Sequence, residues 1–410
     1  MKKYLITIVL IFTCYFYANA QWVKQNSGTT NSIYAVDFVD TEYGWACGYG
    51  GMILHTKNGG QTWTKQTSGV SSVNNIDFVN RNVGWGVGDG WVILHTTNGG
   101  ATWTHDSIDQ NGWYVDAICF PDEKHGWTGY GDILMQTNDG GETWFENDKK
   151  QHNGCTNCYL YNTDGIDAIH FIDSLTGVVV GSYGSPSYTM YTTNGGQDWT
   201  QGSFSINPCS TSLYDVLLVS PTVAYMTGSD SNWKTTNSCV NWYGANAKAG
   251  RNAVLRAVDA VNENTIYFVG DSGVITKSIN GEPFYQMNSN TTSNLYDICI
   301  VDENNAWIVG RNGTILKNDW SLLGVETPKI DNTFSIFPNP LKTTAKVTFM
   351  EPISGVINMY NLMGVKVKSI EIEETKELEI TRGNLPAGVY ILSIQQEGRN
   401  AMLGKIIVTD

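Results

Sequence analysis

The chain has 410 residues, enough for two or three domains, and a formal net charge of −14. The imbalance lies between residues 21 and 328, with 30 acidic against 14 basic residues, because residues 329–410 carry nine of each. So acidic a surface repels phosphate backbones, and we expect no nucleic-acid partner.

Residues 1–20 have the pattern of a secretory signal peptide. Lys2 and Lys3 precede an apolar run, and Ala18-Asn19-Ala20 forms a small-residue cleavage site. A lipoprotein signal at Cys14 is disfavoured because Thr13 is too large for the residue before a lipidated cysteine. No later stretch reaches 18 apolar residues, so we predict an exported mature chain without a transmembrane segment.

An octet recurs six times at a spacing of about 40 residues. It reads TKNGGQTW at 56–63, TTNGGATW at 96–103, TNDGGETW at 137–144 and TTNGGQDW at 192–199, with degraded copies at 235–242 and 278–285. A period of this size indicates a repeat architecture. One unit, residues 32–69, alternates four strand-like segments with turns, which is the size of a propeller blade.

The octet is interpreted as a folding device. Its third residue can accept N–H bonds across the turn, its glycines permit the reversal, and its closing Trp is expected to be buried. The structural residues assigned in this way are Asn58, Trp63, Asn98, Trp103, Asp139, Trp144, Asn194 and Trp199.

The count of first strands predicts seven blades over residues 21–320. They begin near Ile33, Val73, Tyr114, Ile166, Leu213, Leu255 and Leu295. The seventh unit lacks an octet and a fourth strand, but WVKQNSG at 22–28 matches the fourth strand WTKQTSG at 63–69. We therefore expect residues 22–26 to complete blade seven and close the ring. The predicted fold class is all-β, a seven-bladed β-propeller followed by a small immunoglobulin-like β-sandwich.

The octets resemble the Asp-box, or BNR repeat. Together with the Gly-Trp strand and the G-x-I-L-x-T segment, they resemble the propellers of the photosystem II assembly-factor family over about residues 22–320. The resemblance implies the fold more than the function, because such repeats occur in sialidases, other glycosidases, lectins and assembly factors. The assembly factors use a basic patch that this acidic propeller lacks, so photosystem assembly is not carried over.

Residues 321–332 are predicted to be a linker and residues 333–410 the β-sandwich, because alternating apolar runs are separated by turn glycines. PNP at 338–340, YNLMG at 360–364, LPAGVY at 385–390 and KIIV at 405–408 resemble the type IX secretion sorting domain of Bacteroidetes. The resemblance implies periplasmic transit, recognition by the secretion machinery, and release or attachment at the outer surface. The alternative is an adhesive domain that stays attached.

Cysteines in irregular segments of an exported protein favour a disulfide. We expect one bridge among Cys155, Cys158 and Cys209. A C-x-x-C pair without further ligands is no zinc site, and we predict neither a metal nor another cofactor.

Blade four carries two insertions, Glu146–Gly165 and Ser182–Ser187, on the face of the strand-one and strand two–three loops. Insertions on one face of a repeat protein often mark its binding face. We expect this face to present aromatic residues to a glycan or an extracellular protein: Trp91, Trp113, Tyr114, Tyr130, Tyr159, Tyr161, Tyr183 and Tyr188.

A catalytic alternative rests on turn aspartates of the same face. Glycosidases need two carboxylates, and the candidates are Asp89, Asp132, Asp230 and Asp271. A sialidase would need three clamping arginines, and none lies at the expected early position of blade one. We favour a non-catalytic binding propeller, with a glycoside hydrolase and an extracellular assembly scaffold as alternatives.

Overall fold

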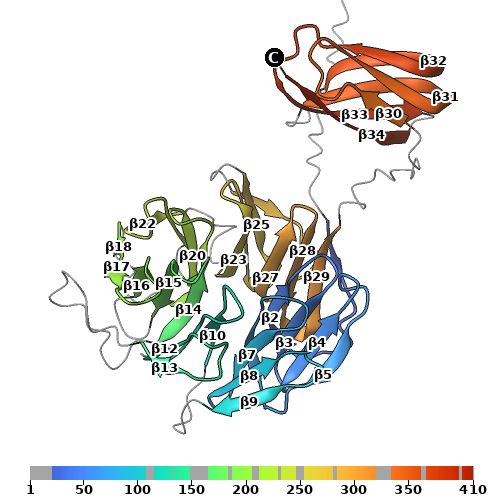
Figure 1. Cartoon of the computed structure of the whole chain (residues 1–410). Coiled ribbons are helices and arrows are strands. Elements are labelled where there is room, and N and C mark those ends of the chain that lie inside the picture. The colour runs from blue at the N-terminus through green and yellow to red at the C-terminus, as the bar shows by residue number, and fades with distance from the viewer. Residues whose placement is uncertain are drawn as a thin grey trace, which may run out of the picture. The chain divides into compact units, whose positions relative to one another are not determined.

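The computed structural model describes residues 21–107, 115–131, 133–147, 165–182, 187–205, 212–229, 232–245, 254–279, 284–319, 334–361, 366–396 and 399–409. These residues form strands and two single-turn 3-10 segments, η1 (Asp271–Gly273) and η2 (Arg311–Gly313). The chain divides into two compact units, Gln21–Asp319 and one containing Trp320–Asp410 (Figure 1). The predicted signal peptide and linker lie outside the described residues.

The described strands of Gln21–Asp319 form seven sheets, which we number as blades in chain order. Blade one contains β2 (Ile33–Phe38), β3 (Gly44–Gly48), β4 (Met52–Thr56) and β5 (Thr64–Thr67). Blade two contains β6 (Val73–Phe78), β7 (Gly84–Gly88), β8 (Val92–Thr96) and β9 (Thr104–Ser107). Blade three contains β10 (Ala117–Cys119), β11 (Gly126–Tyr130), β12 (Ile133–Thr137) and β13 (Phe145–Glu146). Figure 1 shows the first strands β2, β10 and β14 toward the centre of the unit.

Blade four contains β14 (Ile166–Phe171), β15 (Gly177–Gly181), β16 (Tyr188–Thr192) and β17 (Thr200–Gln201). Blade five contains β19 (Leu213–Leu218), β20 (Ala224–Gly228), β21 (Asn232–Thr235) and β22 (Asn241–Gly244). Blade six contains β23 (Leu255–Asn262), β24 (Thr265–Gly270), β25 (Ile275–Ile279) and β26 (Phe284–Met287). A short strand, β18 (Ser203–Phe204), pairs in parallel with β22. Blade seven contains β27 (Leu295–Asp302), β28 (Asn305–Gly310), β29 (Thr314–Asp319) and the first strand of the unit, β1 (Gln21–Lys24).

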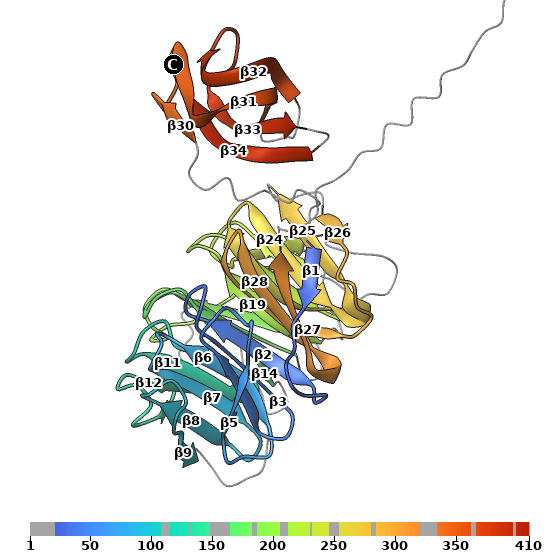
Figure 2. The same ribbon diagram turned by 90° about the vertical axis from the view of Figure 1, so that its right-hand side faces the viewer.

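Strand β1 forms the outer edge of the last blade, where it pairs antiparallel with β29 and Trp22 lies opposite Asn318 (Figure 2). The Trp22 side chain is 1% exposed and meets Tyr267 edge to face, with ring centroids 6.5 Å apart. Asn290 Nδ2 donates to Trp22 O at 3.2 Å. The two ends of the propeller are thus held together by a backbone ladder and a buried aromatic side chain.

Neighbouring blades meet through a repeated aromatic stack. The second-strand Trp of one blade lies flat on the Phe that ends the first strand of the next, as in Trp45 on Phe78, with centroids 3.6 Å apart. The indole nitrogen of Trp45 also donates to Gly99 O of the next octet at 3.1 Å. The same stack joins Trp85 to Phe120, Trp127 to Phe171 and Trp307 to Phe38.

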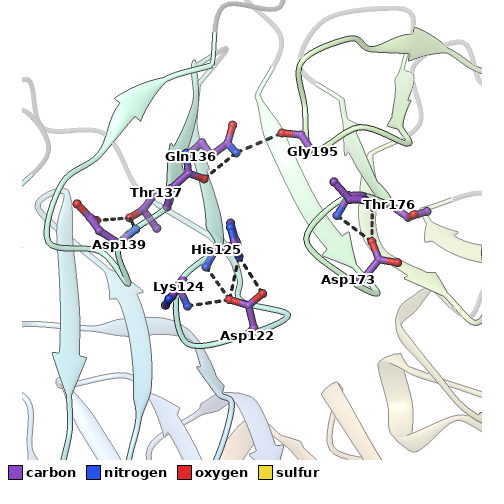
Figure 3. Close-up of polar contacts among 11 residues, drawn as sticks. Asp122, Lys124, His125, Gln136, Thr137, Asp139, Asp173, Thr176 and Gly195 are labelled. Atoms are coloured by element: carbon purple, nitrogen blue, oxygen red, sulfur yellow. Dashed lines mark hydrogen bonds and ion pairs between the residues drawn. The ribbon is translucent and has the colours of Figure 1, made fainter.

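Each well-formed octet is a closed hydrogen-bonded turn. In the first copy Gly60 N donates to Thr56 Oγ1 at 2.9 Å and Thr62 N donates to Asn58 Oδ1 at 3.0 Å. In the third copy Asp139 replaces the Asn, and its bonds from Thr143 and Thr137 lower the pKa of the carboxyl to about 2. Figure 3 shows the bond between Thr137 and Asp139. The closing Trp63 meets Phe38 edge to face. The expectation that the closing Trp is buried is confirmed for Trp199 but wrong for the half-buried Trp63, Trp103 and Trp144.

The second unit is one sheet of five strands: β30 (Phe334–Phe337), β31 (Thr344–Asn361), β32 (Lys366–Thr381), β33 (Gly388–Gln396) and β34 (Arg399–Val408). The long β31 pairs with β30 and β33 along different halves and with β32 along both. The buried side chains of Val347, Ile357 and Ile406 belong to one apolar core of this unit. The predicted fold class, a propeller followed by a β-sandwich-like unit, is confirmed.

Candidate functional site

The first strands line a central channel with a cavity of about 600 Å³. Inside it, side chains of one blade accept N–H groups from the first strand of the next blade. Phe78 N donates to Asp37 Oδ2 at 2.7 Å, and Phe120 N donates to Asp77 Oδ2 at 2.6 Å. Because inner strands of neighbouring blades form no ladder with each other, these carboxylates satisfy N–H groups that would otherwise be buried without a partner.

Five further boundaries repeat this arrangement. The acceptors are Cys119 Sγ, His170 Nδ1, Asp215 Oδ2, Asp259 Oδ2 and Asp297 Oδ2. Confinement in the channel removes water from the carboxyl groups and raises the pKa of Asp37 and Asp215 to about 6, of Asp259 to about 7 and of Asp77 to about 8. The channel wall is thus a structural element whose charge changes near neutral pH.

The second position of each first strand has a different role. In six blades a β-bulge falls there, so that this residue is left out of the ladder with the second strand. Bulges redirect side chains and are common next to functional sites. We call these residues, with the equivalent Asp116 before β10, the mouth ring: Tyr34, Asn74, Asp116, Asp167, Tyr214, Arg256 and Tyr296.

The mouth ring borders a hollow of about 540 Å³ at one end of the channel. Tyr34, Asn74, Asp116, Tyr214, Arg256 and Tyr296 line it, together with Tyr49, Ser72 and Asp89. The octets occupy the other end of the blades, because their glycines bond the turns that follow the first strands, as Gly140 N does with Lys124 O at 2.8 Å. The mouth therefore lies on the face predicted to bind ligands.

One half of the mouth is aromatic. The rings of Tyr34 and Tyr296 lie 6.0 Å apart, and the Arg256 guanidinium lies 5.2 Å from the Tyr214 ring and 5.6 Å from the Tyr296 ring. Asp271 fixes that guanidinium in two contacts, Nε–Oδ1 at 2.5 Å and Nη2–Oδ2 at 3.0 Å. The arginine is thus neutralised within the wall, and its guanidinium contacts both tyrosine rings.

The other half of the mouth carries carboxylates held by neutral donors. Asn74 Nδ2 donates to Asp116 Oδ1 at 3.0 Å, Ser71 Oγ to Asp89 Oδ2 at 3.3 Å, and Ser182 Oγ to Asp167 Oδ2. Desolvation in the hollow, and then Asp89, raise the pKa of Asp116, although this residue is partly accessible to solvent. Burial, and also Asp116, raise the pKa of Asp167 to about 7.

Two predicted aromatic ligand contacts are buried side chains. Trp91 is 3% exposed and Tyr188 is 5% exposed, so the expectation that they are presented to a ligand is wrong for the described structure. Trp91 has a φ of 63°, the same as the equivalent Gly51, and it belongs to one apolar cluster with Val115. The side chain of Tyr130, and Trp113, Tyr114, Tyr159, Tyr161 and Tyr183 entirely, lie outside the described residues.

Of the four aspartates predicted as catalytic candidates, two lie among the described residues and two do not. Asp271 is committed to its ion pair with Arg256, and Asp89 lines the mouth. Asp132, Asp230 and the disulfide candidates Cys155, Cys158 and Cys209 lie outside the described residues. Across the described ranges, no group of three or more His, Cys, Asp or Glu side chains is arranged to hold a metal ion.

The fold and its octets define an Asp-box β-propeller. The family model of the photosynthesis system II assembly factor YCF48 matches residues 16–112 and 107–253, more than half of the chain. The chain belongs to this family. A secretion system C-terminal sorting domain matches residues 335–409, so the propeller is a cargo of type IX secretion, directed to the cell surface or beyond.

Solved structures confirm the propeller fold. YCF48 bound to D1 peptide is 20% identical, with a TM-score of 0.56, over 74% of this chain and 97% of that chain. YCF48 from Cyanidioschyzon merolae is 18% identical, with a TM-score of 0.60, over 73% and 98%. PorZ, a surface component of the type IX secretion system of Porphyromonas gingivalis, is 12% identical, with a TM-score of 0.56, over 93% of this chain and 60% of PorZ.

No curated protein sequence matches the chain. Within the described residues, no helix is long and apolar enough to cross a membrane.

Proposed function

We propose that this protein is an exported, non-catalytic propeller that binds an extracellular polypeptide at the mouth of its central channel. The observation that carries the proposal is the set of β-bulges at one position of six first strands. A propeller needs no such side chains for its core, since the core is formed by the other positions of these strands. The bulges supply a mixed aromatic and charged surface around a hollow, which is the usual composition of a binding site.

The solved YCF48 structure with a D1 peptide supports a polypeptide ligand only by analogy of fold. The acidic character of the mouth does not match the basic patch that the family resemblance implies for assembly factors, so the partner here differs in chemistry. A glycan remains the second candidate ligand because tyrosine rings also stack on sugars.

The hydrolase alternative is weaker in the described residues. Asp271 already accepts two bonds from Arg256, which leaves it poorly placed to transfer a proton to a substrate. An assembly scaffold differs from the proposal only in the number of partners bound, and PorZ shows that this fold occurs in the secretion machinery itself.

The full mature chain can be tested against an immobilised random peptide library and a panel of bacterial, plant and host polysaccharides, with retention and reducing-end release measured together. The proposal predicts retention of peptides without release of sugar. Binding of polysaccharides alone would replace the polypeptide with a glycan. Release of reducing ends would contradict the non-catalytic assignment and direct attention to Asp89 and the other turn aspartates.

A further inference from the structure

Apart from Asp271, the carboxylates of the mouth form no ion pair in the described part of the chain. Ion pairs of the described residues include Arg81 with Asp40 and Glu42, His125 with Asp122, Arg256 with Asp271, and Lys346 with Glu377. Asp89, Asp116 and Asp167 are absent from this set and accept bonds only from Ser and Asn side chains or backbone groups. Asp89 and Asp116 line the hollow without a counter-charge, and Asp167 lines the channel to which it leads, so these carboxylates create a negative potential at the mouth.

Burial is the main cause that raises the pKa of Asp116, of Asp167 and of the Tyr34 hydroxyl. Nearby charge adds to it, from Asp89 at Asp116, from Asp116 at Asp167, and from Asp89 after Tyr296 at Tyr34. With Arg256 neutralised by Asp271, the formal charge of Asp89, Asp116, Asp271 and Arg256 together is −2, from three carboxylates and one guanidinium. An anionic ligand would meet repulsion here, whereas a cation would relieve it.

Besides negative charge, the mouth offers a cation the aromatic faces of its tyrosines. Tyr34 and Tyr296 are neighbours, and both stand at bulge positions beside the hollow. The Arg256 guanidinium already uses the faces of Tyr214 and Tyr296 in this way at 5.2 Å and 5.6 Å. Tyrosine faces attract ammonium and guanidinium groups, more strongly where water is excluded.

We infer that the mouth accepts a basic side chain, lysine or arginine, of a polypeptide ligand, seated between Tyr34 and Tyr296 on one side and Asp89 and Asp116 on the other. This inference rests on the proposed binding function and names the chemistry of its ligand. The mouth thereby selects partners by a single exposed cation, in keeping with the excess of 30 acidic over 14 basic residues in residues 21–328.

The test measures binding of three labelled nonapeptides of glycine and serine to the full mature chain at physiological salt. One carries a single central lysine, the second a glutamate and the third a glutamine. The lysine peptide is expected to bind at least roughly tenfold more tightly than the other two, since a desolvated cation–π contact alone has this magnitude. Equal binding of the three peptides would overturn the inference and leave the proposed function standing. If none of the three peptides binds although peptides of the library do, the inference of a cation site is wrong and the proposed binding of polypeptides still stands.

Single-residue variants show whether binding of the lysine peptide depends on the mouth or on the general negative charge of the protein surface. Tyr296→Leu and Asp116→Asn are each expected to weaken the lysine peptide roughly tenfold, whereas Tyr296→Phe keeps the ring and retains binding. Glu142→Gln, on an exposed octet at the other end of the blades, removes the same charge and should change affinity less than about twofold. An equal loss in Glu142→Gln, or a loss in Tyr296→Phe as large as in Tyr296→Leu, would contradict the site.

Discussion

The backbone N–H of Phe78 in blade two donates to the Asp37 carboxylate in blade one at 2.7 Å, across a boundary where no strand ladder runs. A side chain of the preceding blade makes the equivalent bond at each of the other boundaries. Five of the seven acceptors are aspartates, and the other two are Cys119 and His170, so the centre of the propeller is held mainly by acid side chains of the channel wall. The stability of the ring is consequently linked to proton binding in the channel.

Stability is expected to fall as the pH rises from 6.5 to 8.5. The folded-state pKa values of Asp259 and Asp167, about 7, and of Asp77, about 8, lie above the unfolded value of 3.8, so the folded protein binds more protons in this range. Each carboxyl that ionises removes on the order of 1 kcal/mol. Thermal unfolding of the mature chain at closely spaced pH values measures the loss.

Asp77→Asn provides the matched variant for the pH measurement. Its amide oxygen can still accept the Phe120 N–H, but it does not titrate, so the decline above pH 7 should become shallower. Glu142→Gln should leave the curve unchanged because that side chain is exposed. A melting temperature that rises between pH 6.5 and 8.5 in the wild type would show that ionisation of the channel carboxyls does not destabilise the folded protein.

The closure of the ring by β1 is expected to contribute strongly to stability. Trp22→Ala removes a side chain that is 1% exposed and should cost roughly 3–5 kcal/mol in the free energy of unfolding. Lys24→Ala alters an exposed residue of the same strand and should cost less than about 0.5 kcal/mol. Chemical denaturation of the three proteins compares them, and equal midpoints would mean that β1 does not close the ring.

The octets are expected to tolerate Asp in place of the Asn at their third position, but not the loss of its side-chain oxygen. Asn58→Ala leaves Thr62 N without its side-chain acceptor and should cost about 1 kcal/mol. Asn58→Asp reproduces the third copy, where Asp139 Oδ1 accepts from Thr143 N at 2.9 Å, and should be close to neutral above pH 5. Destabilisation by Asn58→Asp as large as by Asn58→Ala would refute the equivalence of the copies.

The buried thiols should be unreactive in the native protein. Burial raises the pKa of the Cys47 and Cys119 thiols well above its usual range and that of Cys239 to about 12, so little thiolate forms at pH 8. Alkylation with iodoacetamide followed by mass spectrometry should label these three residues only after unfolding. Rapid labelling of Cys47 in the native chain would show that its blade opens.

The propeller was predictable because its signals are local and repeated. The octet sequence specifies its own turn, and the likeness of residues 22–28 to 63–69 reveals a displaced fourth strand. The sorting domain was recognisable for the same reason, from short motifs in a fixed order. Such patterns depend on neighbouring residues and not on the packing of distant ones.

The mouth ring was missed because its members share a position and not a residue type. Tyr34, Asn74 and Asp167 look like ordinary exposed residues at the start of a strand until the bulge places them on one rim. An alignment of the seven first strands at their second residue could have found them. Trp91 was misassigned for the opposite reason, since its positive φ turns an apparently exposed loop residue into the core.

The most direct test of binding at the mouth is amide hydrogen exchange of the full mature chain with and without a bound peptide from the library. The account predicts slower exchange at the starts of β2, β19, β23 and β27 and in the turns at Asp89 and Asp271, with no change at the octets. Protection confined to the octet face or to the sorting domain would contradict it.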